Sequence, residues 1–375
     1  MTHNLKVLFL VRHNFYSSPG GAQIQILKTS EELKKLGCEC DISTDPNSCD
    51  FKKYDIVNVT DLTWIYDLLE YKAVLTKQNT PFVLTTIYWP FDDYVSHAAP
   101  LLQRILYYLI GINGTERLKA LYKFIRKREW IYLQGVFHGY ISSQRRIAKA
   151  AEWMLPNSEM EMAALNQRLG LQCQNYSVVN NAIDLKAFLE EKEKNTVARD
   201  ENMILFVGRI DPRKNQLKFL EAIYDTPYKV CFIGQPGPNS KYYYKRLVEL
   251  GEKRGNTEFV AQIPQNKVFE YMLRAKTHVL PSWVETPGLV SLEAYYAGCN
   301  VVVADKGSVR EYFQEEAFYC DPADKTSILN AVNAAMKSSY TGNLAKKIET
   351  EYTWKFAAEQ TFAAYQKILQ MRKKS

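Results

Sequence analysis

Residues 6–37 read KVLFLVRHNFYSSPGGAQIQILKTSEELKKLG. The stretch from Lys6 to Val11 is a short apolar run, which has the length of a buried strand. A loop follows over residues 12–21, and Ile24, Leu27 and Leu33 then recur at helical spacing until a glycine ends the pattern. This succession predicts a strand, a glycine-containing loop and a helix.

The alternation of strands and helices continues through both halves of the chain. In the first half, strands are predicted at residues 40–43, 56–59, 82–87, 153–156 and 176–179, with a helix at 64–77. In the second half, strands are predicted at residues 203–207, 229–233, 258–261, 278–280 and 300–303, with helices at 216–224 and 242–253. Strands separated by helices indicate parallel, doubly wound sheets of the α/β class.

A break in this pattern predicts the domains. Residues 190–202 are charged and polar, as is typical of a linker, and they separate a domain at 1–189 from a second at 203–352. Helical spacing of apolar residues then predicts a C-terminal helix within 353–375. At 375 residues the chain is long enough for two hydrophobic cores. Two such sheets that face each other across a cleft would bind ligands at the carboxyl ends of their strands.

The composition, with 46% apolar and 24% charged residues, is that of an ordinary globular protein. The seven cysteines form no C-x-x-C pair and accompany no histidine cluster, so neither a disulfide framework nor a zinc site is expected. The first apolar run is too short for a signal peptide, and the longest uncharged apolar stretch, residues 105–112, cannot span a bilayer. We therefore expect a cytoplasmic protein.

Residues 285–293 read ETPGLVSLE and give the strongest indication of function. A helix that begins near Gly288 would place Glu293 in its second turn and Glu285 in the preceding loop, so both carboxylates could border a pocket at the helix N-terminus. The free amides of such a terminus hold phosphate, and carboxylates accept hydrogen bonds from sugar hydroxyls. This combination favours a nucleotide sugar. The alternative is that Glu285 caps the helix and Glu293 lies on a solvated face.

Two further loops add candidate ligands at strand ends. Arg209 and Lys214 follow the strand at 203–207, where they can clamp a diphosphate or simply be solvated. Gly20 and Gly21 either permit close backbone approach to a phosphate or sugar, or form an ordinary turn. No D-x-D sequence occurs, so we expect protein cations, rather than a metal ion, to neutralise the diphosphate.

Residues 100–150 carry ten basic side chains against two acidic ones, within a chain whose net charge is +7. A helix over 116–133 would gather apolar side chains on one side, namely Leu118, Leu121, Tyr122, Ile125 and Tyr132. One interpretation is a shallow seat on an anionic membrane surface, at the inner face of the cell membrane. The alternative is a helix that packs on the core with a solvated basic face. Nucleic acid is not the expected partner, because no recognised binding module accompanies the charge.

Taken together, these motifs resemble the family 4 glycosyltransferases over nearly the whole chain. The matching pieces occur in the family's order and are Gly20-Gly21, Asn181 to Asp184, Gly208 to Lys214, Gly234, Pro281-Ser282 and Glu285 to Gly298. The resemblance implies the GT-B fold, in which two Rossmann-like domains face each other across a cleft and the last helix returns to the first domain. It also implies transfer with retention of anomeric configuration, usually without a metal or other cofactor.

The resemblance implies roles for single residues as well. Glu293 would bind the ribose hydroxyls of the nucleotide, and Glu285 would face the hydroxyls of the donor sugar. Arg209 and Lys214 would neutralise the diphosphate, so that these two cations and Glu285 form the catalytic set. The remaining donor-binding positions are Gly20, Gly21, Thr286, Pro287, Gly288, Leu289 and Val290.

The chain departs from the family pattern in two places. Many relatives have a histidine after the strand that corresponds to residues 82–87, whereas this chain reads Thr86-Ile-Tyr-Trp-Pro90. Tyr88 is the candidate to position the reacting sugar or the acceptor, or else it merely packs. The second departure is Thr286-Pro287, where the family often has glycine and phenylalanine.

We therefore expect an enzyme that transfers a sugar from a UDP- or GDP-linked donor to a hydroxyl of a sugar or a lipid-linked saccharide, in the synthesis of surface polysaccharide or glycolipid. Two alternatives remain on the same fold, a nucleotide-sugar epimerase and a non-catalytic nucleotide-sugar binding protein.

Overall fold

The computed structural model describes residues 4–17, 20–194 and 197–374, which form two compact units. The first unit comprises Met1–Pro90, Leu101–Ala182 and Trp354–Ser375, and the second comprises Phe91–Pro100 and Ile183–Thr353. Part of the predicted glycine loop, Ser18 and Pro19, lies outside the described residues, as do Asn195 and Thr196 of the predicted linker.

The first unit contains a parallel sheet in the order β2-β1-β3-β4-β5. Its strands are β1 (Lys6–Leu10), β2 (Glu39–Ser43), β3 (Ile56–Thr60), β4 (Val83–Thr85) and β5 (Trp153–Leu155). Every residue of β3, β4 and β5 is buried, as expected for parallel strands that are covered on both faces. The predicted parallel α/β sheet is thus confirmed for this unit.

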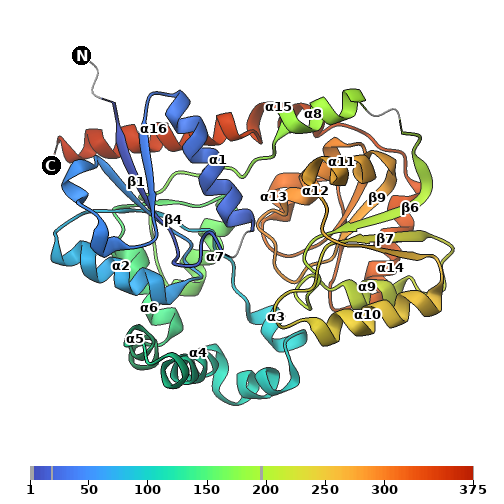
Figure 1. Cartoon of the computed structure of the whole chain (residues 1–375), viewed down its shortest axis with the longest axis horizontal. Coiled ribbons are helices and arrows are strands. Elements are labelled where there is room, and N and C mark those ends of the chain that lie inside the picture. Colours follow the sequence, from blue (N-terminus) through green and yellow to red (C-terminus); the bar gives the residue numbers. More distant parts are fainter. Residues whose placement is uncertain (1–3, 18–19, 195–196, 375) are drawn as a thin grey trace. The chain divides into compact units, whose positions relative to one another are not determined.

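The helices of this unit are α1 (Gly21–Lys35), α2 (Ile65–Lys77), α4 (Leu101–Lys127), α5 (Ile131–His138), α6 (Tyr140–Ala150), α7 (Glu159–Leu169) and α16 (Trp354–Arg372), with short 3-10 turns at Pro46–Ser48 and Phe51–Lys53. Helices α4 and α5 pack on each other and on α2 and α6 rather than on the sheet. The C-terminal helix α16 lies beside α1 (Figure 1). Nδ2 of Asn58 in β3 donates a 2.7 Å hydrogen bond to the Tyr365 hydroxyl of α16, so α16 is part of the first unit although it ends the chain.

The second unit contains a larger parallel sheet in the order β11-β10-β9-β6-β7-β8. Its strands are β6 (Asp200–Val207), β7 (Lys229–Ile233), β8 (Thr257–Val260), β9 (Ala275–Leu280), β10 (Asn300–Ala304) and β11 (Phe318–Cys320). Its helices are α3 (Asp92–His97), α8 (Leu185–Lys194), α9 (Gln216–Ala222), α10 (Lys241–Arg254), α11 (Gln265–Arg274), α12 (Leu289–Tyr296), α13 (Val309–Phe313), α14 (Lys325–Lys337) and α15 (Ala345–Glu351). The edge strand β11 is not among the predicted strands, because three residues are too few to show a pattern.

The structure differs from the sequence-based expectation at the connection between the halves. The predicted linker 190–202 contains the end of α8 and the start of β6, and the chain passes from the first unit to the second at Ala182 and Ile183. Apart from the buried Glu191, the charged residues of α8 form the exposed side of an amphipathic helix whose Phe188 is buried, which explains why they resemble a linker in the sequence. The predicted strand at 176–179 forms only a single bridge, from Tyr176 to Met154.

The predicted helix at 116–133 is also corrected. Helix α4 ends at Lys127, and Arg128 has a φ of 57°, so the chain turns before α5 begins. Within α4, Gly111 has a φ of 65° and separates two helical segments. Among the described residues, no helix is long and apolar enough to cross a bilayer.

The apolar side of α4 does not face the core. Its Leu118, Leu121, Tyr122 and Ile125 side chains are exposed, whereas Tyr132 of α5 is buried. The alternative of a core-facing helix is therefore wrong for these four side chains.

Candidate active site

The loop after β6 presents a lysine to a glutamate of the loop after β9. The Nζ atom of Lys214 forms an ion pair with Oε1 of Glu285, and the two side chains are 17% and 12% exposed. A local turn directs Lys214, because Oδ1 of Asp211 accepts hydrogen bonds from the amides of Arg213 at 3.0 Å and Lys214 at 3.2 Å. Two residues that the sequence singles out, 71 positions apart, are thus in direct contact.

The loop that carries Glu285 is held by its neighbours. Nδ2 of Asn215 donates to the carbonyl of Pro281 at 3.2 Å, and the amide of Trp283 donates to the carbonyl of Arg213 at 2.9 Å. On the other side, a Cβ added at Gly307 would lie 1.8 Å from the Glu285 carbonyl oxygen. Glu285 therefore sits where the loops after β6, β9 and β10 meet, at the carboxyl ends of these strands.

The helix predicted after Glu285 is present and begins where the sequence indicates. Helix α12 starts at Leu289, with Gly288 as its N-cap at a φ of 87°. A Cβ added at Gly288 would lie 3.5 Å from Oε2 of Glu285, so this carboxylate lies near the first turn of α12. The amides that follow Gly288 are available at this terminus because a helix leaves its first N–H groups without intrahelical partners.

Glu293 lies in the second turn of α12, as predicted, and is partly buried. Its Oε2 accepts a 2.9 Å hydrogen bond from Nε2 of Gln265. Burial raises the pKa of Glu293 to about 8, the Gln265 hydrogen bond opposes this rise, and the charge of Asp184 adds to it. The alternative of a solvated face residue does not describe this environment.

Arg209 lies on the same loop as Lys214 but is more exposed. Its side chain runs over Gly237, where an added Cβ would lie 3.3 Å from Cδ of Arg209. At the base of this region the strand ends of β6 and β7 approach closely, since a Cβ at Gly234 would lie 2.1 Å from the carbonyl oxygen of Gly208. Glycine at position 234 is therefore required by backbone packing.

A buried histidine connects β9 to α12 close to the charge of Lys214. His278 of β9 is fully buried, and its Nε2 lies 3.1 Å from the Ser291 hydroxyl of α12. Burial, together with the positive charge of Lys214, lowers the pKa of His278 to about 3. A neutral imidazole therefore links β9 to α12 beneath the candidate site.

The candidate residues of the first unit are in a different environment. Gly20 and Gly21 lie at the start of α1, and a Cβ added at either would meet nothing within 4 Å. Packing within the protein thus does not require these glycines. Tyr88 is only 2% exposed and packs in the core of the first unit, which favours the packing interpretation of this residue over substrate contact.

A buried carboxylate that the sequence analysis does not predict organises the loop around Tyr88. Oε1 of Glu161 accepts a 2.8 Å hydrogen bond from the Tyr88 amide and one from the Thr86 hydroxyl, and Oε2 accepts a 3.0 Å bond from the Asn157 amide. Complete burial raises the pKa of Glu161 to about 7. These bonds connect the strand ends of β4 and β5. Only the fold reveals this role, because partners 73 and 75 positions away leave no local motif.

Asp61 is a second buried carboxylate at a strand end of this unit. It has a φ of 72°, and its Oδ1 accepts a 3.2 Å bond from the amide of Thr63. Burial raises its pKa to about 6, and the charge of Arg12 opposes the rise. Arg12 in turn lies 4.9 Å from the ring centroid of Trp64. Polar and aromatic groups thus gather at the carboxyl ends of β1 and β3.

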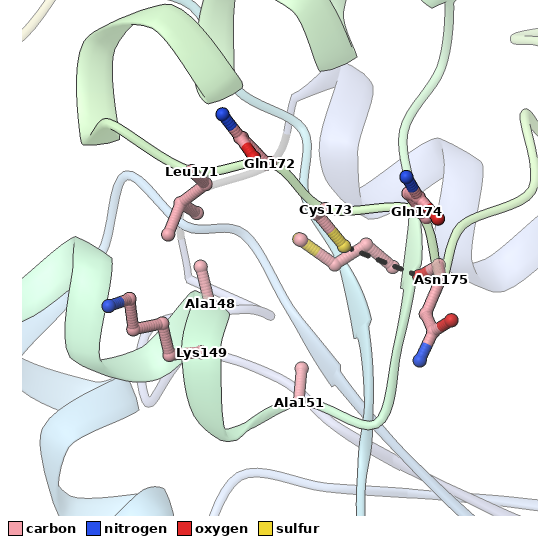
Figure 2. A pocket seen from close by; sticks show the side chains of 9 residues that line it. Ala148, Lys149, Ala151, Leu171, Gln172, Cys173, Gln174 and Asn175 are labelled. Carbon is pink, nitrogen blue, oxygen red and sulfur yellow. Dashed lines mark hydrogen bonds between the residues drawn. The ribbon is translucent and has the colours of Figure 1, made fainter.

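A separate surface hollow of about 450 Å³ lies between the end of α6 and the segment from Leu171 to Asn175 (Figure 2). Its described lining contains one cation, Lys149, and no carboxylate. The Cys173 thiol lies 3.7 Å from the Asn175 carbonyl oxygen, and burial raises the pKa of this thiol. The hollow therefore lacks the charged pair of the Lys214 and Glu285 site. Across the described residues, no cluster of three or more metal-ligating side chains occurs.

Known proteins resemble this chain in both sequence and structure. Residues 188–352 match the family model described as Glycosyl transferases group 1. D-inositol 3-phosphate glycosyltransferase of Geodermatophilus obscurus is 26% identical over 247 residues, which cover 60% of this chain and 54% of that protein. O-antigen chain mannosyltransferase B of Escherichia coli is 27% identical over 175 residues, which cover 43% of this chain and 45% of that protein.

Two solved structures share the fold over nearly the whole chain. Sucrose-phosphate synthase from Thermosynechococcus elongatus has a TM-score of 0.75 at 18% identity and covers 98% of this chain and 100% of its own. HepE of Anabaena, in complex with UDP and glucose, has a TM-score of 0.67 at 15% identity, with coverages of 96% and 99%. The two parallel-sheet units of this chain are those of the GT-B fold.

Residues 188–352 are thus similar to the group 1 glycosyl transferases, and this matched range includes Arg209, Lys214, Glu285 and Glu293. The matched segments span about half the length of the curated relatives.

Proposed function

We propose that this protein is a glycosyltransferase that moves a sugar from a UDP- or GDP-linked donor to a hydroxyl acceptor, with retention of anomeric configuration and without a metal ion. The Lys214–Glu285 pair is the observation that carries this proposal. It places a cation and a carboxylate together at the carboxyl ends of β6 and β9, where open α/β sheets bind ligands. The group 1 match of the same residues supports it.

The chemistry follows from the charges of these groups. A departing nucleoside diphosphate gains negative charge, which Lys214 and Arg209 neutralise where it develops. The amides at Gly288, Leu289 and Val290 add the partial positive charge of a helix N-terminus. Because these groups are already in place, catalysis depends on fixed electrostatics and positioning and needs no covalent nucleophile.

The two carboxylates divide the recognition of the donor. Glu285, beside the first turn of α12, accepts hydrogen bonds from the sugar hydroxyls, with Thr286 and Pro287 shaping the loop. Glu293, one turn further along α12, accepts hydrogen bonds from the ribose hydroxyls. The glycines at 20 and 21, whose Cβ positions are open, leave room for a ligand beside the start of α1.

The acceptor that we propose is a saccharide linked to a membrane lipid, as in surface polysaccharide or glycolipid synthesis. Support comes from the α4–α5 surface, which we define by its exposed apolar side chains: Leu101, Leu102, Ile105, Tyr108, Leu109, Ile110, Leu118, Leu121, Tyr122, Ile125, Trp130 and Phe137. The most exposed are Trp130 at 77% and Leu109 at 74%. Apolar patches of this extent mark a site of interaction.

The charges around the α4–α5 surface favour an anionic membrane as its partner. Arg117, Lys123, Arg126 and Arg128 are exposed beside the apolar side chains. A hollow of about 500 Å³ is lined by Tyr122 and three cations, Lys119, Lys123 and Arg126, of which Lys119 also forms a 2.6 Å ion pair with Glu116. A helix with an apolar stripe flanked by cations is suited to lie in the membrane interface.

A donor panel tests the proposed activity. The purified chain is incubated with labelled UDP- and GDP-sugars, with and without a lipid-linked saccharide, and release of free nucleotide is followed. We expect release that depends on acceptor with one donor class, and loss of release in Lys214→Met. Epimerised sugar without nucleotide release would identify an epimerase instead. Tight donor binding with neither product would identify a binding protein.

A further inference from the structure

Helix α3 belongs to the second unit although it lies in the first half of the sequence. Residues Phe91–Pro100 belong to this unit, although the segments before and after them, ending at Pro90 and starting at Leu101, belong to the first. The segment lies outside the residues that match the group 1 family. Figure 1 shows α3 in cyan. It belongs to the second unit through packing contacts, because the chain on both sides of it belongs to the first unit.

An aromatic stack attaches α3 to the loop that carries Glu285. The imidazole of His97 stacks on the Trp283 ring, with centroids 5.1 Å apart and an interplanar angle of 13°. Nδ1 of His97 lies 3.0 Å from the Asp93 carbonyl oxygen, which orients the ring from within α3. Trp283 is 2% exposed, its Nε1 has no hydrogen-bond partner among the described residues, and Nζ of Lys218 lies 5.7 Å from its ring centroid, so ring contacts hold the indole.

An ion pair attaches α3 to a second loop of the site. Oδ2 of Asp93 lies 2.7 Å from Nζ of Lys306. Lys306 directly precedes Gly307, whose backbone packs against the carbonyl of Glu285. Helix α3 thus contacts the surroundings of Glu285 in two places. One contact is with Trp283, two positions before Glu285, and the other is with Lys306 in the loop after β10.

The loop after β6 is connected to α3 through Trp283. The Trp283 amide donates a 2.9 Å hydrogen bond to the carbonyl of Arg213, which directly precedes Lys214. Helix α3 therefore contacts the loops after β9 and β10 directly and the loop after β6 through Trp283.

We propose that α3 is a positioning element of the donor site, in which His97, acting through Trp283, holds the Glu285 loop in register with Lys214. This inference rests on the proposed function. Neither His97 nor Trp283 needs to touch the substrate. Loss of the stack would let the loop at 281–288 shift, and a misplaced Glu285 would bind the donor sugar poorly in the transition state while the nucleotide-binding Glu293 on α12 stays in place.

Two substitutions at one position test the stack. His97→Ala removes the ring, and His97→Phe keeps a flat ring of similar size. We expect His97→Ala to lower kcat for nucleotide release about tenfold with the affinity for free UDP or GDP within twofold of the unmodified protein. His97→Phe should restore kcat to within threefold. His138→Ala, at an exposed histidine of α5, is the matched control and should leave kcat unchanged.

Hydrogen exchange of the backbone amides gives a readout that needs no activity. Exchange at residues 281–288 should become at least fivefold faster in His97→Ala and return toward the original rate in His97→Phe. Unchanged exchange and unchanged kcat in His97→Ala would overturn the inference, as would a His97→Phe variant as impaired as His97→Ala. If the unmodified protein releases nucleotide from no donor, the proposed function fails, and the exchange rates alone then decide the role of α3.

Discussion

Lys214 and Glu285 form an ion pair between the loops that follow β6 and β9, with little of either side chain exposed. Each charge neutralises the other in a partly desolvated setting, so removal of one leaves the second without compensation. A diphosphate that binds Lys214 must share this cation with Glu285. The pair is therefore a support of the loops and, in the proposed function, a preset part of the donor site.

Substitution of Lys214 alone should cost more stability than substitution of both members of the pair. We expect Lys214→Met to lower the free energy of unfolding by about 2 kcal/mol, because Glu285 is left unpaired, and the double variant with Glu285→Gln to recover about half of this loss. Nucleotide release should fall about 100-fold in each single variant and little further in the double variant. Urea unfolding and release assays measure the two effects. Strictly additive losses would show that the two side chains act independently.

Gly307 offers a test of how tightly the Glu285 loop is held. Gly307→Ala would place a Cβ 1.8 Å from the Glu285 carbonyl oxygen, which forces the backbone to move. We expect a loss of about 3 kcal/mol or more in stability, together with loss of donor turnover. The matched control is Gly255→Ala, which also has a positive φ, of 87°, but meets nothing within 4 Å. It should cost only about 1 kcal/mol and leave turnover intact. Equal effects of both variants would contradict the tight packing at Gly307.

The raised pKa of Glu293 predicts a pH-dependent contribution to stability. The folded state retains this proton up to about pH 8, whereas the unfolded chain releases it near pH 4.5, the ordinary pKa of a glutamate. The contribution is therefore full below about pH 4.5 and is lost as the pH rises toward 8. We expect the free energy of unfolding of Glu293→Gln, relative to that of the unmodified protein, to be about 2 kcal/mol higher at pH 8.5 than at pH 5. Urea unfolding at both pH values measures this difference. The carboxyl groups of Glu161 and Asp61 remain in both proteins, so their contributions cancel in this comparison. An equal stability difference at both pH values would contradict the burial of Glu293.

The affinity for nucleotide should show the opposite trend. If the Glu293 carboxylate accepts the ribose hydroxyls, the free protein must first lose the proton, so UDP or GDP should bind more tightly as the pH rises from 7 to 9. Glu293→Gln should lack this trend. Titration calorimetry at three pH values measures it, and a pH-independent affinity of the unmodified protein would argue against this role.

The α4–α5 surface should bind anionic vesicles at low salt. Replacing the exposed Leu109 and Ile125 with glutamine should weaken binding about tenfold or more, because each buried methylene contributes about 0.8 kcal/mol. Replacing Lys119 and Arg126 with glutamine should weaken it by about 1 kcal/mol per charge and reduce its dependence on salt. Vesicle sedimentation measures the binding.

Matched controls for this surface exist elsewhere on the chain. Tyr242→Gln removes an apolar side chain that is 75% exposed on α10, and Lys355→Gln removes an exposed cation on α16. Both controls should bind vesicles as the unmodified protein does. Self-association of the unmodified protein that Leu109→Gln abolishes, without any vesicle binding, would assign the surface to a second copy of the chain instead.

The burial of Tyr88 leads to a simple expectation. Its ring packs in the core of the first unit and its amide, rather than its hydroxyl, is held by Glu161. Tyr88→Phe should therefore keep nucleotide release within about twofold. A large loss in a folded variant would show that the hydroxyl takes part in acceptor or sugar positioning after all.

The sequence by itself determined the parts of this protein whose information is local. Strand and helix periods predicted two parallel sheets, because buried parallel strands are continuous apolar runs and the helices between them are amphipathic. The Pro-Gly break predicted the start of α12 and thereby the place of Glu293. In the structure Gly288 has a positive φ and α12 begins at the next residue.

Tertiary structure decided what depends on partners that are distant in the chain. The sequence shows Lys214 and Glu285 as two candidates, and only the adjacency of β6 and β9 in the sheet brings their loops into contact. The same holds for Glu161 beneath the Tyr88 loop and for α3, whose ten-residue segment packs with the second unit despite its place in the first half. An apolar face in the sequence does not specify what covers it. That the apolar side chains of α4 are exposed therefore became visible only in the fold.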